Sequence, residues 1–225
     1  MVLTLHRAAF VLPDPADPTA PSIADGAVVV RGERVEAVGP YRDLAAAHPG
    51  ARVRDWGAAV LAPGLRHPYG HRLLERAYHP DPREEVGLDP VADGLVGCVD
   101  EARCGASARR GLQRMLGCGV TAVAGPFERA AVRTAVARSG VVGLGPGGSP
   151  GASVVPGGPS EAGEGAWSVD PLVVLPFADA VYGRVTAGGR ADFAVFAGEK
   201  GAPAAPVAGG CLATVLGGRL VYRRR

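Results

Sequence analysis

Histidine is the residue type with the most informative chemistry in this sequence, because its ring binds metal ions and exchanges protons near neutral pH. The five histidines lie at positions 6, 48, 67, 71 and 79. His67 and His71 have the four-residue spacing of two metal ligands on one helical turn, but Pro68 and Gly70 lie between them and disfavour a helix. A zinc site normally needs at least three protein ligands, so this pair alone leaves a site incomplete.

Two interpretations of this segment stay open. His71 with His79 and Asp81 could supply the third ligand of a metal site, although Pro80 and Pro82 leave the geometry of that arrangement undetermined. Alternatively, the segment is a loop that binds no metal. The number of ligands favours the loop.

Other chemical patterns give weaker signals. Residues 143–148 match GxGxxG, but a dinucleotide site also needs a helix to begin there and an acidic residue about 20 positions later, whereas Ser149 and Pro150 continue a glycine-rich stretch. No serine lies in a GxSxG motif, which removes the main signal for a Ser-His-Asp hydrolase. The four cysteines form no CxxC pair, so we expect free, partly buried thiols.

Composition restricts the partners. Lys+Arg 24 against Asp+Glu 22 gives a formal net charge of +2, which offers no reason to expect nucleic acid or an acidic membrane surface. No stretch approaches the roughly 20 apolar residues that span a bilayer, and the first residues resemble no signal peptide. We therefore expect a cytoplasmic protein.

The N-terminal part is predicted to be rich in β-strands. Two runs of β-branched residues at 26–31 and 34–39, with Gly32-Glu33 between them, predict a hairpin. Residues 41–48 predict a short helix that ends at Pro49-Gly50. Further strands are predicted at residues 2–5, 52–56 and 58–62.

The centre alternates between strands and helices. Helices are predicted at 106–116 and 128–138, and strands at 120–124 and 141–144, an order that implies a parallel unit. Residues 145–167 contain eight Gly and four Pro and predict a flexible linker. Apolar strands are then predicted at residues 171–175, 191–196, 211–216 and 219–222.

Both ends of the chain resemble a known arrangement. Gly26-Ala27-Val28-Val29-Val30 followed by Arg34-Val35-Glu36-Ala37-Val38-Gly39 and Val60-Leu61-Ala62-Pro63-Gly64, together with Gly189-Arg190-Ala191-Asp192 and Gly217-Gly218-Arg219 near the end, resembles the amidohydrolase superfamily, in particular aminodeoxyfutalosine deaminases and imidazolonepropionases. The resemblance implies an α/β fold in which a truncated (β/α) barrel remnant is flanked by a small β-sandwich made from both chain termini. The implied composite domain is 1–61 plus 184–225, and 62–183 form the partial barrel.

The length of the centre agrees with truncation. Without the linker it has about 100 residues, while a βα unit takes about 30 and a full barrel about 250. Three units fit and eight do not.

The family's metal ligands are only partly present. The resemblance implies an HxH pair after the first barrel strand, two later histidines and an aspartate around Zn or Fe. Here Tyr69 occupies the first position of the pair and His71 the second, and residues 80–225 contain no histidine. His71 is therefore the one candidate metal residue, no catalytic or cofactor-binding residue is assigned, and Zn or Fe is expected only if the residual site functions.

Two functions from different classes follow. By resemblance, the chain is a hydrolase acting on carbon–nitrogen bonds other than peptide bonds, with lost or much reduced activity. The alternative is a non-catalytic scaffold or interaction protein that retains the composite domain. An open parallel sheet with few covering helices also predicts a homo-oligomer or a protein partner.

Overall fold

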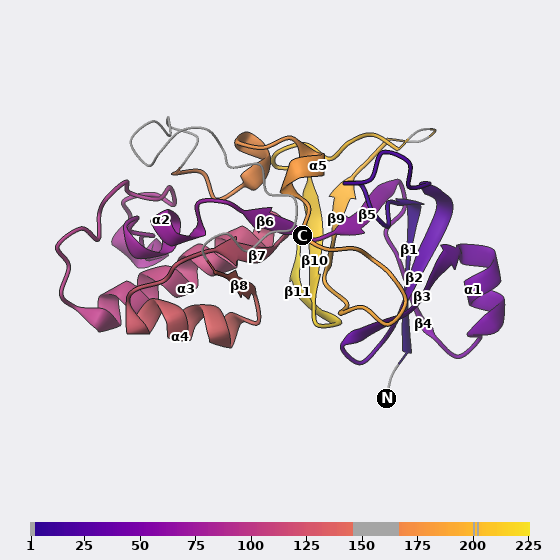
Figure 1. Ribbon diagram of the computed structural model, residues 1–225, viewed down its shortest axis with the longest axis horizontal. Helices are drawn as coiled ribbons and strands as arrows, with labels where there is room; N and C mark the ends of the chain where they lie inside the picture. The colour runs from indigo at the N-terminus through magenta and orange to yellow at the C-terminus, as the bar shows by residue number, and fades with distance from the viewer. Residues whose placement is uncertain (1–2, 146–166, 200, 202) are drawn as a thin grey trace.

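The computed structural model describes residues 3–145, 167–199, 201 and 203–225. These residues form a mixed α/β structure with two sheets (Figure 1), so the predicted α/β class is confirmed. The strands are β1 (Leu3–Val11), β2 (Ile23–Arg31), β3 (Arg34–Pro40), β4 (Arg52–Asp55), β5 (Ala59–Pro63), β6 (Leu65–His67), β7 (Val120–Ala124), β8 (Val142–Leu144), β9 (Phe193–Ala197), β10 (Cys211–Leu216) and β11 (Arg219–Arg223). The helices are α1 (Tyr41–Ala47), α2 (Gly70–Glu75), α3 (Glu101–Gly117), α4 (Ala130–Ser139) and α5 (Phe177–Ala180), with 3-10 turns η1 (Pro82–Glu84) and η3 (Pro171–Val173).

Strands from both ends of the chain join one eight-stranded sheet. Its order is β11-β10-β9-β5-β1-β2-β3, and β4 pairs with β1 off this path. The predicted hairpin is present as β2 and β3, and Gly32 in its turn has a φ of 62° that favours glycine. The link between the two ends is β9, which pairs antiparallel with β5 on one side and with β10 on the other.

The eight-stranded sheet curves around an apolar core of its own. Val28 of β2, Leu61 of β5, Val195 of β9 and Val215 of β10 are buried in this one cluster. The backbone amide of Val35 also donates to the Gly189 carbonyl at 2.9 Å, which ties β3 to the segment before β9. The N-terminal and C-terminal strands therefore share a sheet and a core.

The two hairpin turns of this sheet meet at Gly218. A Cβ at Gly218 would lie 1.9 Å from the Gly32 carbonyl oxygen, and its φ of 72° is left-handed. We expect Gly218→Ala to lower the free energy of unfolding by about 2–4 kcal/mol. The clash of the new Cβ and the left-handed backbone conformation of a non-glycine residue each contribute to this loss. Chemical denaturation measures the change. Gly50→Ala is the control, since nothing lies within 4 Å of a Cβ there; equal losses for the two variants would contradict the contact.

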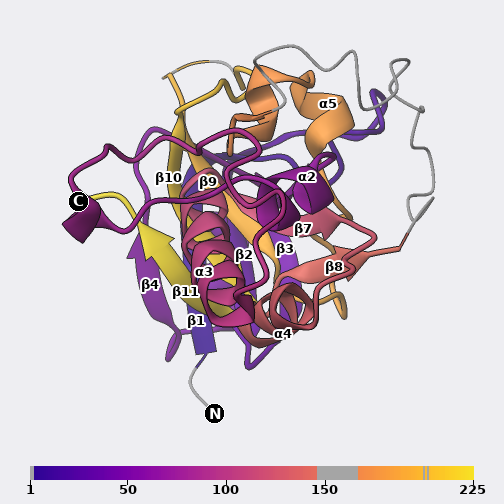
Figure 2. The same cartoon turned by 90° about the vertical axis from the view of Figure 1, so that its left-hand side faces the viewer.

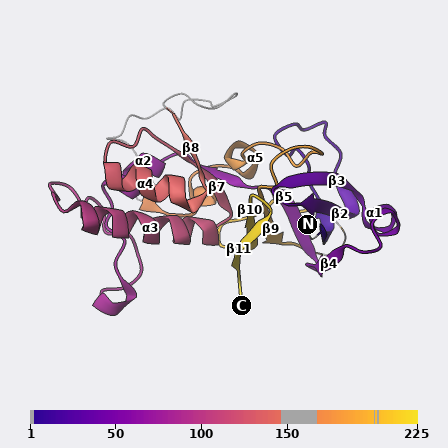
Figure 3. The same ribbon diagram turned by 90° about the horizontal axis from the view of Figure 1, so that it is seen from below.

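A smaller parallel sheet, β6-β7-β8, lies beside the first. Figures 1 and 3 show it on the side of β9–β11 opposite to α1, and Figure 2 shows α3 in front of the larger sheet with α4 beside it. A second core joins these layers, and Phe196 of β9, Leu112 of α3 and Val123 of β7 are all buried in it. Successive residues of β9 thus face two different cores.

Of two apolar strands predicted at 58–62 and 171–175, only the first is present. It forms β5, which is buried at every position and belongs to the eight-stranded sheet, while β6 begins the parallel sheet. Residues 171–175 are not a strand, since η3 covers Pro171–Val173. The Asp170 carboxylate accepts a hydrogen bond from the Leu172 amide at 3.0 Å, and this cap favours a helical turn over extended backbone.

Several predicted boundaries also differ. The first strand continues to Val11 because it pairs with β2 over its whole length. Helix α3 begins at Glu101, five residues earlier than expected, because Asp100 caps the amides of Ala102 and Arg103. The predicted linker falls almost entirely on residues 146–166, which lie outside the described residues. In the described part of the chain, no helix is long and apolar enough to cross a membrane.

Candidate functional site

The segment with the partial HxH motif joins β6 to α2. A Cβ at Gly70 would lie 2.8 Å from the Ala124 carbonyl oxygen, so glycine lets the helix start directly against the end of β7. The Tyr69 carbonyl accepts the amide of Leu73 at 3.0 Å, which closes the first turn. The predicted loop is therefore wrong at both histidines, since His67 is the last residue of β6 and His71 lies on α2.

His67 is fully buried, and both of its ring nitrogens have backbone partners. Nε2 lies 2.9 Å from the Ser168 carbonyl oxygen, and Nδ1 accepts the Tyr69 amide at 3.2 Å. Burial lowers the pKa of His67 to about 4, while the bond to Ser168 acts in the opposite direction. This geometry fixes a neutral ring with its proton on Nε2, and it leaves no lone pair for a metal ion.

His71 differs from His67, because its ring is half-buried and its Nδ1 atom is buried without a hydrogen-bond partner. Burial lowers its pKa, followed by the positive charge of Arg72. A buried nitrogen with a free lone pair is what a metal ligand requires. The neighbouring Tyr69, at the first position of the motif, directs its ring toward His67, with 6.5 Å between ring centroids.

The third histidine of the region, His79, has a structural role. Its Nε2 lies 2.9 Å from the Leu73 carbonyl oxygen, and its amide donates to the Ser107 hydroxyl at 2.9 Å. Burial lowers its pKa to about 4. Asp81 caps η1 and lies 3.6 Å from Arg110. The structure therefore uses His79 and Asp81 to join this loop to α3.

The donor set does not fit a metal centre. Within residues 3–145, 167–199, 201 and 203–225, no group of three His, Cys, Asp or Glu side chains is placed to hold an ion. His71 has an available nitrogen, but both ring nitrogens of His67 have backbone partners, and those of His79 lie against the Leu73 carbonyl oxygen and Arg114 Nη1.

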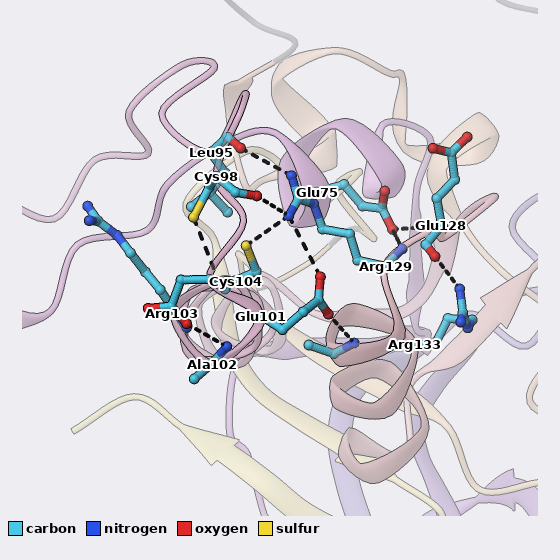
Figure 4. Close-up of polar contacts among 12 residues, drawn as sticks. Glu75, Leu95, Cys98, Glu101, Ala102, Arg103, Cys104, Glu128, Arg129 and Arg133 are labelled. Carbon is cyan, nitrogen blue, oxygen red and sulfur yellow. Dashed lines mark hydrogen bonds and ion pairs between the residues drawn. The ribbon is translucent and has the colours of Figure 1, made fainter.

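A second polar cluster surrounds the start of α4 and was not anticipated from the sequence. It borders a cleft of about 770 Å³, and Figure 4 shows the polar contacts of the cluster. Glu75 accepts the amide of Arg129 at 2.9 Å, and Glu101 accepts the amide of Ala131 at 3.1 Å. Two carboxylates from other helices thus cap α4, whose own N-cap residue, Arg129, provides no side-chain cap. The signal in the sequence was an arginine at the N-cap position of this helix. An arginine side chain has no hydrogen-bond acceptor, so the first amides of the helix need an acceptor from elsewhere in the chain.

Comparison with known proteins supports the resemblance. Residues 26–51 match the family model of the bacterial imidazolonepropionase-like composite domain, and in the structure these residues cover β2 from Gly26, then β3 and α1. No curated protein matches the chain.

Solved structures give matches of low identity. Guanine deaminase from Bradyrhizobium japonicum is 18% identical with a TM-score of 0.47, over 64% of this chain and 35% of that one. Helicobacter pylori aminofutalosine deaminase is 16% identical with a TM-score of 0.43, over 64% and 33%. An adenosine deaminase from Xanthomonas campestris with bound zinc is 21% identical with a TM-score of 0.43, over 63% and 33%.

This chain spans about a third of the length of each of these proteins. The sequence-based resemblance to the imidazolonepropionase-like composite domain is confirmed over residues 26–51.

Proposed function

We propose that this chain is an amidohydrolase-like protein of the class that hydrolyses carbon–nitrogen bonds other than peptide bonds, and that its activity is lost or much reduced. The observation that carries the proposal is His67. Its two ring nitrogens are bonded to the backbone of Ser168 and Tyr69, so the histidine nearest to His71 in sequence cannot serve as a second ligand. Activating water at neutral pH requires a firmly held ion.

Metal analysis tests this proposal. We expect purified protein, dialysed against zinc or iron and then against buffer, to retain much less than one ion per chain. We also expect His71→Ala to change the free energy of unfolding by less than about 1 kcal/mol. A metal ion bound to His71 would stabilise the folded chain, and the substitution would then be strongly destabilising. His48→Ala is the control for loss of a histidine outside this region. One firmly held ion per chain that His71→Ala removes would contradict the proposal.

The finer description of the fold is part of the same proposal. We propose that 1–61 plus 184–225 form the composite β-sandwich domain, and that 62–183 are a partial barrel. The shared sheet of β1–β5 and β9–β11 supports the first unit. The parallel order β6-β7-β8, with α4 between β7 and β8, supports the second.

A second candidate function is an interaction or scaffold role through self-association. The loop between η1 and α3 exposes a set of large apolar side chains: Val86, Leu88, Val91, Val96 and Val99. Val99 is 94% exposed. Apolar residues gathered on one surface segment are typical of protein contacts.

Light scattering at micromolar concentration tests the interaction role. We expect a mass above the 22.8 kDa of one chain, and we expect Leu88→Ser with Val99→Ser to restore the single-chain mass because the apolar contact is removed. Val53→Ser, an exposed position on β4, is the control. A single-chain mass for the unmodified protein would contradict self-association and would leave the hydrolase proposal unaffected.

A further inference from the structure

Cys98 and Cys104 lie together at the start of α3. Cys104 is completely buried in a small cluster with Tyr78 and Leu95, and Cys98 packs against that cluster. Burial, followed by the neighbouring Cys98 thiol, raises the pKa of Cys104, and Cys98 Sγ itself donates to the Asp100 carbonyl oxygen at 3.8 Å. Cys98 is only partly buried. The Cys98 thiol is therefore partly accessible to solvent, whereas the neighbouring Cys104 thiol is not.

A guanidinium group holds the pair. Nη1 of Arg129 donates to the Cys98 carbonyl oxygen at 2.7 Å and to Cys104 Sγ at 3.1 Å, and Nη2 donates to the Leu95 carbonyl at 3.2 Å. Figure 4 shows Arg129 reaching both cysteines from the start of α4. The Arg129 charge opposes the burial that raises the pKa of Cys104, because a cation in contact with sulfur favours the thiolate, which is the reactive form.

The other two cysteines provide an internal comparison. Cys118 and Cys211 are also near enough to influence each other, and burial raises their pKa values to about 12 and about 11. Cys211 contacts Thr214 and the Ala213 carbonyl. Cys104, by contrast, accepts a hydrogen bond from the guanidinium group of Arg129.

From this geometry we propose that Cys98 and Cys104 are a reversible redox modification site, oxidised by a hydroperoxide to an intramolecular disulfide. The Cys98 thiolate attacks one peroxide oxygen, the O–O bond breaks, and the departing hydroxide takes a proton to become water. Cys98 is then a sulfenic acid. The Cys104 thiolate, stabilised by Arg129, attacks the Cys98 sulfur, so that the S–S bond forms, the S–O bond breaks, and the departing hydroxide takes a proton from solvent to become a second water. Two thiols lose two electrons, and one peroxide gains them.

The cleft beside the pair provides the route for the oxidant. Val96 and Gly97, which immediately precede Cys98, line the 770 Å³ cleft together with Arg129. Cys98 is thus the thiol that meets peroxide first, and Cys104 is the resolving thiol. Oxidation would link the loop before α3 to the first turn of α3 covalently.

Peptide mapping tests the proposal with the intact protein. Arg103 separates the cysteines, so trypsin cleaves between them and a disulfide joins residues 84–103 to 104–109. After treatment with hydrogen peroxide and alkylation of free thiols, we expect this linked pair, with the chain mass lower by about 2 Da. Dithiothreitol should restore two alkylatable thiols. Cys118 and Cys211 should stay alkylatable throughout.

Variants distinguish a thiol pair activated by Arg129 from two cysteines that are only close in space. Arg129→Gln should slow formation of the linked peptide about tenfold, because losing one neighbouring charge raises a thiol pKa by about one unit. Arg129→Lys should recover most of the rate. Arg133→Gln, on the same helix, is the control, and circular dichroism verifies that each variant is folded. Free Cys98 and Cys104 after peroxide, equal oxidation of Cys118 with Cys211, or a rate that does not depend on Arg129 would overturn the proposal.

Discussion

Between pH 6.5 and pH 4 the protein is expected to lose stability steeply, because three histidines are buried in the neutral form. His6, His67 and His79 have pKa values lowered by burial from 6.5 to about 3, 4 and 4. Below pH 6.5 the unfolded chain binds protons at these sites and the folded chain does not, so stability is complete above pH 6.5 and decreases as the pH falls. Each histidine lowers the free energy of unfolding by about 1.4 kcal/mol per pH unit, and the three together lower it by about 4 kcal/mol per pH unit.

Urea denaturation at a series of pH values measures this slope. His6→Gln should reduce the slope by about a third, whatever its effect on stability at pH 7, because one titrating group is removed. His6 accepts a hydrogen bond from Trp56 and is 1% exposed, so a change in the baseline is expected and only the slope is diagnostic. A free energy of unfolding that is constant from pH 7 to pH 5 would show that these rings are accessible to protons in the folded state.

Phe196→Ala is expected to lower the free energy of unfolding by about 3–5 kcal/mol, the usual cost of deleting a fully buried aromatic ring. Phe196 is 0% exposed, and its ring packs edge-on against Phe177 at 6.0 Å between centroids. It also packs against Gly119, whose Cβ position would be 3.0 Å from the ring. The ring therefore joins β9 to the turn before β7 and so connects the two sheets.

Two further substitutions make this measurement specific. Phe196→Leu keeps most of the apolar volume and should cost less than about 1.5 kcal/mol. Val221→Ala, on β11 at 41% exposure, should stay within about 0.5 kcal/mol. If Phe196→Ala costs no more than Val221→Ala, the packing of the smaller sheet onto β9 is not what stabilises the molecule.

The sequence alone determined the elements whose signals are local. The β2–β3 hairpin follows from two runs of β-branched residues on either side of Gly32, and α4 ends where Gly140 adopts a φ of 77°. These features depend on the residue types that favour turns and on the spacing of apolar side chains within a few residues. Both can be recognised in the sequence without knowing which elements pack together. The resemblance at residues 26–51 rests on the same compact segment.

Only the tertiary structure decided which surfaces meet. The apolar run at β5 indicated a buried strand, but its partner β9 lies more than 130 residues later in the chain, and an apolar strand pairs equally well with many others. His67 is bonded to Ser168, 101 residues away, and Arg129 reaches Cys98 and Cys104 across the start of two helices. Long-range hydrogen bonds of this kind leave no periodic trace in a sequence, because they depend on where the packed elements bring the chain in space.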